Sequence, residues 1–226
     1  MILLLGSGCE KTETGTNQNV EIGALLSLTG NWSSLGITSQ EAINLAITDV
    51  NAFMLQKGNN LKFSATFLET KLEAALAKDA INAGLAKKIK YFIGPQSSAE
   101  LAAVKPIADA NNFIAPNFGL PSLANPDLAR ITAAIQSKTN LVPDAYALAA
   151  YDAVWVIART VESMRSSGND YTTVKNIFKA ESGKFFGITG QTILNQAGDR
   201  SQGAFDYWGI GLENGKFKWI LKGKSS

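Results

Sequence analysis

Short apolar runs alternate with amphipathic stretches over the first half of the chain. The apolar runs predict strands at 20–28, 61–67, 91–93 and 113–116. The stretches between them have the apolar spacing of helices, at 38–54, 72–88 and 97–110. Strands and helices that alternate at this spacing predict βαβ units around a parallel sheet.

Two of these helices carry local signals. Ile43, Ala46 and Val50 lie on one face of the first, and Thr38 followed by Glu41 fits a capping box at its start. In the third, Pro106 lacks an amide donor and predicts a kink.

In the second half of the chain the pattern of apolar and polar residues changes. Residues 120–143 are a proline-rich, polar stretch that predicts a connection without regular structure, and 144–164 are apolar on most faces, which predicts a long buried helix. A shorter helix is predicted at 171–180. Strands predicted at 205–212 and 216–221 flank an Asn-Gly pair, the typical signal of a β-hairpin.

The amino terminus is a short apolar run that ends in small residues and Cys9, and a polar tether follows it to residue 19. This order resembles a bacterial lipoprotein signal, which predicts export and lipidation at Cys9. The alternative is a frayed apolar terminus with an incidental cysteine. Gly6 stands where a lipoprotein signal normally has an aliphatic residue, and no basic segment precedes the run.

Composition excludes several kinds of chemistry. The 226 residues are 46% hydrophobic and carry a formal charge of +2, so the charge gives no reason to expect a nucleic-acid partner. The sequence has no histidine, which excludes His-dependent nucleophiles and His-ligated metals, and its single cysteine cannot form an internal disulfide. We expect no catalytic residue, no metal site and no cofactor.

Five segments, in order, resemble one known family. They are Ile22–Gly30, Phe92–Ser98, Ile114–Pro116, Tyr146–Val154 and the pair Gly187–Gly190 with Gly198–Arg200. Together they are similar to the type I periplasmic-binding proteins, and specifically to the leucine/isoleucine/valine-binding receptors of ABC transporters. The resemblance implies an α/β fold with a doubly wound, mainly parallel sheet (the first lobe of that family), here followed by a C-terminal β-hairpin.

The resemblance also implies that most of the second lobe is missing. In that family the chain crosses to a second α/β lobe at the point where this sequence has only the short stretch between Arg130 and Asp144. We therefore divide the chain into a signal and tether (1–19) and a single lobe (20–226). That lobe is built from 20–130 and 144–190, with a second-lobe remnant at 191–226.

Ligands of open parallel sheets bind beyond the carboxyl ends of the strands. Three loops lie there in the predicted fold, and the resemblance implies amino-acid contacts from the second and third. The candidate ligand-binding residues are Trp32, Ser34, Leu35, Gln96, Ser97, Ser98, Asn117, Phe118 and Gly119.

Several candidates have structural alternatives. Ser97 forms an S-x-x-E capping box with Glu100, so its hydroxyl can equally serve its own helix. Phe118 can pack in the core, and Trp32 can be an exposed surface aromatic. Asp152, which lies in an apolar helix, is expected to make a structural hydrogen bond rather than a ligand contact.

The function implied is that of an extracytoplasmic solute-binding protein of an ABC transporter, in truncated single-lobe form. Its ligand would be a branched-chain amino acid or a related small polar molecule. The implied partners are that ligand, an ABC permease and a membrane reached only through the lipid anchor, and self-association is open. The alternative is a single-lobe interaction module, or a non-functional deletion product, that binds no ligand. An enzyme on a flavodoxin-like sheet is disfavoured because no Gly-rich phosphate loop follows Leu28.

Overall fold

The computed structural model describes residues 18–111, 125–165, 170–195, 200–201, 206–213 and 216–224. Its strands are β1 (Gln18–Leu26), β2 (Leu61–Glu69), β3 (Tyr91–Ile93), β4 (Phe186–Gly187), β5 (Gly190–Gln191), β6 (Asp206–Glu213) and β7 (Lys216–Lys224). Its helices are α1 (Ser33–Gln56), α2 (Ala74–Ala86), α3 (Ser98–Asn111), α4 (Leu128–Thr139), α5 (Ala145–Met164) and α6 (Tyr171–Lys184).

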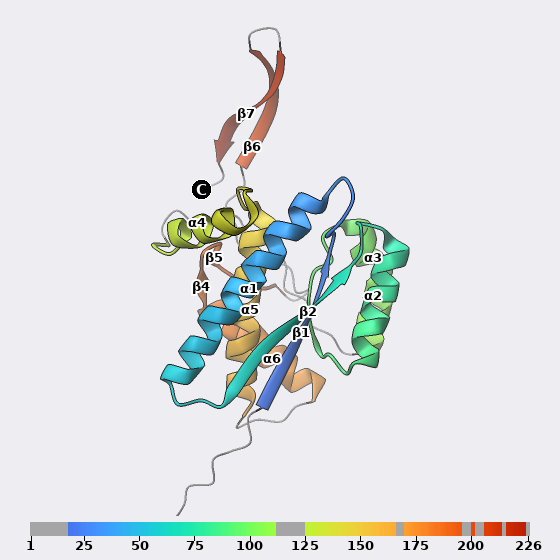
Figure 1. Cartoon of the computed structure of the whole chain (residues 1–226), viewed down its shortest axis with the longest axis vertical. Helices are drawn as coiled ribbons and strands as arrows, with labels where there is room; N and C mark the ends of the chain where they lie inside the picture. The colour runs from blue at the N-terminus through green and yellow to red at the C-terminus, as the bar shows by residue number, and fades with distance from the viewer. Residues whose placement is uncertain are drawn as a thin grey trace, which may run out of the picture.

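A parallel sheet of order β2-β1-β3 lies at the centre of the described fold (Figure 1). β1 pairs with β2 along its whole length, with Val20 opposite Phe63, and with β3 only at Ile22–Ala24. The alternating strands and helices of the sequence are therefore confirmed as βαβ units. The strand predicted at 113–116 lies outside the described residues.

Helices cover both faces of this sheet. One apolar cluster joins β1 and β2 to α1, α4 and α5, and a smaller one joins Leu25 and Phe92 to α2 and α3. Figure 1 shows the same separation, with α2 and α3 on one side of the sheet and α1 and α5 on the other. Burying a side chain such as Phe63 stabilises the fold by about 1.5–3 kcal/mol. The doubly wound α/β class is confirmed.

Helix α1 begins five residues before the predicted capping box. Trp32 is its N-cap, and the Thr38 hydroxyl lies inside the helix, where it donates to the Ser34 carbonyl at 2.9 Å. The capping-box prediction was wrong because the Ser-rich loop is itself helical. Gly36 permits this, since a Cβ there would lie 2.0 Å from the Ser27 carbonyl oxygen.

Helix α4 occupies a stretch that the sequence predicted to be irregular. Its apolar stripe is narrow, because only Ile131 and Ile135 are buried, Leu128 is partly buried beside the core, and its other side chains are polar or small. The two buried side chains reach the main core beside α1, and Asn140 ends the helix in the left-handed conformation at φ 58°. Such a short stripe is difficult to recognise among polar residues.

Helices α5 and α6 begin at side-chain caps. Asp144 accepts a hydrogen bond from the Ala147 amide at 2.9 Å, and Asp170 accepts one from the Thr173 amide at 3.1 Å. The long buried helix is confirmed, and α6 runs four residues beyond its predicted end to Lys184. Pro106 lies inside α3, which is assigned as one continuous helix.

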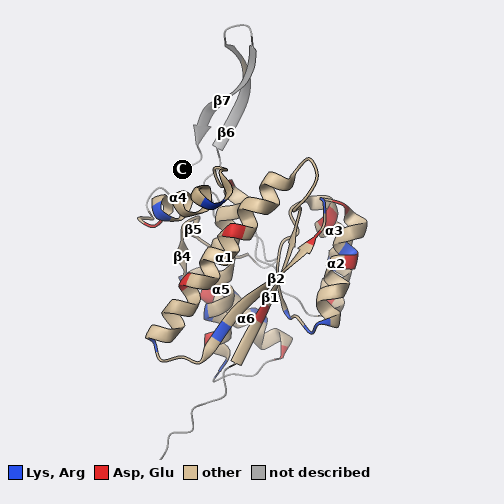
Figure 2. Ribbon diagram, in the orientation of Figure 1, with Lys and Arg blue, Asp and Glu red and all other residues tan. Residues whose placement is uncertain are grey.

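Two hairpins complete the described chain. β4 pairs antiparallel with β5, and β6 pairs antiparallel with β7 in a register that shifts between Tyr207 and Trp208. The C-terminal hairpin is thus confirmed, whereas its Asn-Gly turn lies outside the described residues. In the described part of the chain, basic and acidic residues are intermixed over the helices and strands (Figure 2).

Candidate functional site

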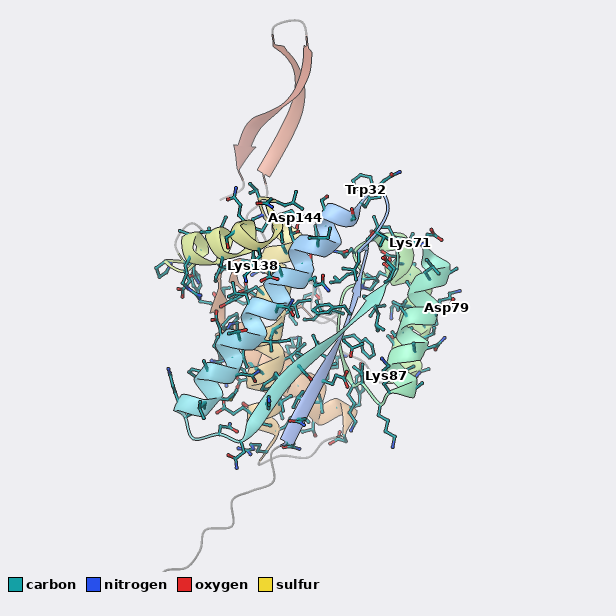
Figure 3. The ribbon with its side chains drawn as sticks, viewed as in Figure 1. Trp32, Lys71, Asp79, Lys87, Lys138 and Asp144 are labelled. Carbon is teal, nitrogen blue, oxygen red and sulfur yellow. The ribbon has the colours of Figure 1, made fainter. Side chains whose placement is uncertain are left out.

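The carboxyl ends of β1, β2 and β3 meet at one edge of the sheet, which we call the carboxyl edge. The segments that follow these strands are 27–32, 70–73 and 94–97, and they lead into α1, α2 and α3. Figure 3 shows Trp32 and Lys71 at this end of the molecule. This is the edge at which ligands of open α/β sheets bind.

Gln96 ties two of these segments together. Its Oε1 accepts from the Ser27 amide at 2.9 Å, and its Nε2 donates to the Leu35 carbonyl at 3.2 Å and to the Ser39 hydroxyl oxygen at 3.1 Å. The side chain is buried, and all of these partners belong to the protein. Gln96 therefore supports the carboxyl edge from within.

Glu69 makes the corresponding link on the other side of β1. Its Oε1 accepts from the Leu28 amide at 3.0 Å and from the Lys71 amide at 2.8 Å. Burial alone would raise the pKa of Glu69, but these amides and the Thr29 hydroxyl outweigh it and hold the pKa below its usual value. The side chain thus remains an anion that orders two of the three segments.

The capping box predicted at the start of α3 is present. The Ser97 hydroxyl donates to Glu100 Oε2 at 2.7 Å and accepts from the Glu100 amide at 3.3 Å. Glu100 is fully buried, and its Oε1 has no hydrogen-bond partner. Ser97 therefore has the structural role that was its alternative, whereas Ser98 lies exposed in the first turn of α3.

The candidates of the first loop lie at the start of α1. The Trp32 side chain is 60% exposed, Ser34 is exposed and Leu35 is half-buried. These residues lie at the start of α1, and Ser98 lies at the start of α3. Both helix starts belong to the carboxyl edge. Asn117, Phe118 and Gly119, together with the lipidation candidate Cys9, lie outside the described residues.

Several amides at the carboxyl edge and at the start of α3 already have partners. Side chains of the protein accept from four of them: Gln96 from the Ser27 amide, Glu69 from the Leu28 and Lys71 amides, and Ser97 from the Glu100 amide. What the described edge offers to a ligand is exposed hydroxyl groups and an exposed indole. Sequence reasoning found Gln96 but missed Glu69, whose only signal was an acidic residue at the end of an apolar strand.

Asp152 has the structural role that was expected. Its Oδ1 accepts from the Ile188 amide at 2.9 Å, and its Oδ2 accepts from the amide and the hydroxyl of Thr189. A Cβ on Gly187 would lie 2.3 Å from this carboxylate, so only glycine allows the close approach. Asp152 thus joins α5 to the β4–β5 hairpin.

No group of three or more Cys, Asp or Glu side chains in the described part of the chain is placed to hold a metal ion. Nor does any helix in that part of the chain have the length and apolarity needed to cross a bilayer.

Residues 120–212 match the model of the receptor family ligand-binding region. An uncharacterized protein of Methanocaldococcus jannaschii is 24% identical over 104 residues, which make up 46% of this chain and 25% of that relative. The chain therefore spans about a quarter of the relative that it matches.

Several solved structures share the fold. The leucine-binding protein LivK of Thermotoga maritima aligns with a TM-score of 0.65 and 13% identity, over 89% of this chain and 98% of that one. LivJ of Streptococcus pneumoniae, a branched-chain amino acid transporter substrate-binding protein in complex with isoleucine, aligns with a TM-score of 0.67 and 12% identity, over 90% and 100%. A solute-binding protein of Rhodopseudomonas palustris in complex with benzoate aligns with a TM-score of 0.64 and 12% identity, over 90% of this chain and 96% of that one.

These likenesses confirm the resemblance in the sequence: the chain has the fold of the type I periplasmic-binding proteins, and its residues 120–212 carry the signature of the receptor family ligand-binding region.

Proposed function

We propose that this chain is an extracytoplasmic solute-binding protein of an ABC transporter, present as a single lobe. The observation that carries the proposal is a carboxyl edge with ordered segments and exposed hydroxyl and indole groups, in a fold shared with LivK and LivJ. Its solute would be a branched-chain amino acid or a related small polar molecule. It would catalyse no reaction.

The ligand contacts would come from two helix starts. Trp32, Ser34 and Leu35 would contact the solute from α1, and Ser98 would contact it from α3. Asn117, Phe118 and Gly119 remain proposed contacts of the third loop. Gln96 and Ser97 would act indirectly, by holding the segments between which the solute lies.

A single lobe supplies only one wall of a binding site. Small-molecule sites commonly bury about 70–90% of the ligand surface, and two-lobed receptors achieve this by closing a hinge. We therefore expect this chain to bind amino acids in the millimolar range or more weakly.

Export, lipidation at Cys9 and contact with a permease belong to the same proposal. The short apolar run before Cys9 and the polar tether after it support an anchor at the outer face of a membrane.

A second candidate function is a single-lobe interaction module. Trp32 favours it, because a large side chain 60% exposed at the carboxyl edge can serve as an anchor for a protein partner. In that case the partner, or a second copy of the chain, would cover the carboxyl edge.

Calorimetric titration with leucine, isoleucine, valine and their amides tests the proposal. We expect weak binding that Trp32→Ala reduces further and that Tyr171→Ala, an exposed aromatic on α6, leaves unchanged. Micromolar binding by the monomer would contradict the single-wall site. Absence of binding, together with a dimer in light scattering that Trp32→Ala dissociates, would replace the proposal with the interaction module.

A further inference from the structure

A cavity lies among α1, α4, α5 and β4, and its lining shares no residue with the carboxyl edge. Its volume is about 220 Å³. Its lining includes the α4 N-cap Asp127, Arg130 of α4, Tyr151 and Trp155 of α5, Phe186 of β4 and the preceding Phe185. At about 30 Å³ for each water, this space corresponds to roughly seven waters, the size of a small organic molecule.

The charged side chains that line the cavity are mostly acidic. Asp49 accepts from the Tyr151 hydroxyl at 2.6 Å and from Arg130 Nη2 at 3.0 Å, and Asp127 accepts from Arg130 Nε at 3.2 Å. Asp152 also reaches the lining. The Asp152 carboxylate accepts from the Ile188 and Thr189 amides and is attracted by Arg200, so it adds little to the field in the cavity. Arg130 alone faces the two carboxylates of Asp49 and Asp127, so the lining favours a cation over an anion.

Aromatic rings also line the cavity. Trp155 packs edge-on against Phe53 with centroids 5.5 Å apart, and its ring is stacked with that of Phe185 at 6.5 Å. Phe186 is 54% exposed at the rim. The faces of such rings attract cations. Lys57 Nζ lies 5.3 Å from the centroid of Phe53, a ring that packs against Trp155 but does not itself line the cavity.

We propose that this cavity binds a small organic cation, an ammonium group carried by an apolar or aromatic substituent. The ammonium would lie beside Asp127 and Asp49, and the substituent would pack against Trp155 and Phe186. The proposal does not depend on the function proposed for the carboxyl edge, because the two sets of residues do not overlap.

Three probes that share one ring test the sign of the charge. The full-length ¹⁵N-labelled chain is titrated with benzylammonium, benzyl alcohol and benzoate while the backbone amide shifts are followed. We expect benzylammonium to shift the amides of Arg130, Gly187 and Ile188 with a millimolar dissociation constant that rises with salt. The alcohol and the acid should bind there at least about two- to five-fold more weakly, because neither can form the ion pair with Asp127 and Asp49, and loss of an exposed ion pair has an effect of about this size. Equal binding of benzoate at these amides, or no shift there with benzylammonium, would overturn the proposal.

Exposed positions give variants that keep the fold. Asp127→Asn removes an ion-pair partner of the ammonium and Phe186→Ala removes a packing contact of its substituent, so each should weaken benzylammonium binding by about two- to five-fold. The matched controls lie on α3: Asp109→Asn, where the carboxylate is 63% exposed against 61% for Asp127, and Leu101→Ala, where the side chain is 50% exposed. If the two test variants bind the cation as tightly as the two controls do, the cavity is not its site.

Discussion

Replacing Gln96 removes the side chain that joins two segments of the carboxyl edge. Gln96→Leu keeps the apolar part of the side chain and deletes three hydrogen bonds, at 2.9, 3.2 and 3.1 Å. The largest loss is at Ser27, which is fully buried, since an unpaired buried amide costs about 1–3 kcal/mol. The Leu35 carbonyl loses less, because the Thr38 hydroxyl also donates to it at 3.3 Å.

We expect Gln96→Leu to lower the free energy of unfolding by about 2–4 kcal/mol, the cost of the orphaned amide plus a smaller cost for the other two bonds. Urea unfolding followed by circular dichroism measures it, with Gln136→Leu on the exposed side of α4 as the control, which should change stability by less than about 0.5 kcal/mol.

Gln96→Glu separates the roles of the two ends of the amide. The new carboxylate can still accept from the Ser27 amide, but its second oxygen faces the Leu35 carbonyl, where Nε2 donated. Repulsion there raises the pKa of the new side chain in the fold, so the penalty is full at neutral pH and is relieved as the pH falls through that raised value. A Gln96→Leu protein as stable as the control, or a Gln96→Glu deficit that does not shrink on acidification, would refute the reasoning.

Two further predictions concern the elements that support this edge and the hairpin beside α5. Gly187→Ala would place a Cβ 2.3 Å from the Asp152 carboxylate and should cost about 1–3 kcal/mol in urea unfolding. Gly183 lies inside α6, and a Cβ there would meet no atom within 4 Å, so Gly183→Ala should instead stabilise the fold by about 0.5–1 kcal/mol. Equal changes in the free energy of unfolding for Gly187→Ala and Gly183→Ala would contradict the close contact at Gly187. For Glu69, the lowered pKa means that its contribution is present above the ordinary carboxyl pKa and is lost as the pH falls through the folded value. Glu69→Gln should therefore be less stable by about 1 kcal/mol at neutral pH, with the difference vanishing in acid; a difference independent of pH would show that the charge does not matter.

Much of the fold could be predicted from the sequence because its local signals are strong. The apolar runs at β1, β2 and β3 and the long stripe of α5 have one clear periodicity each. α4 was missed because just two of its side chains, Ile131 and Ile135, are buried. The start of α1 was misplaced because Gly36, which allows the helix to approach Ser27, resembles a loop residue when its neighbours are unknown.

The candidate site was less predictable, because a polar side chain near a ligand edge has two possible partners. Sequence position placed Gln96 and Ser97 at the carboxyl edge, whereas their hydrogen bonds to Ser27 and Glu100 become visible only in the folded structure. The Asp49–Arg130–Tyr151 cluster joins residues up to 102 positions apart, and no local pattern indicates such a contact.

The most direct test of solute binding at the carboxyl edge is a map of where an amino acid perturbs the chain. With the ¹⁵N-labelled protein and L-leucine, we predict amide shifts that gather at residues 31–35 and 97–98, at the starts of α1 and α3, and that saturate only at millimolar or higher concentration. Shifts that gather at the amino ends of β1 and β2 or around the α4 cavity, or no shifts at all, would contradict it.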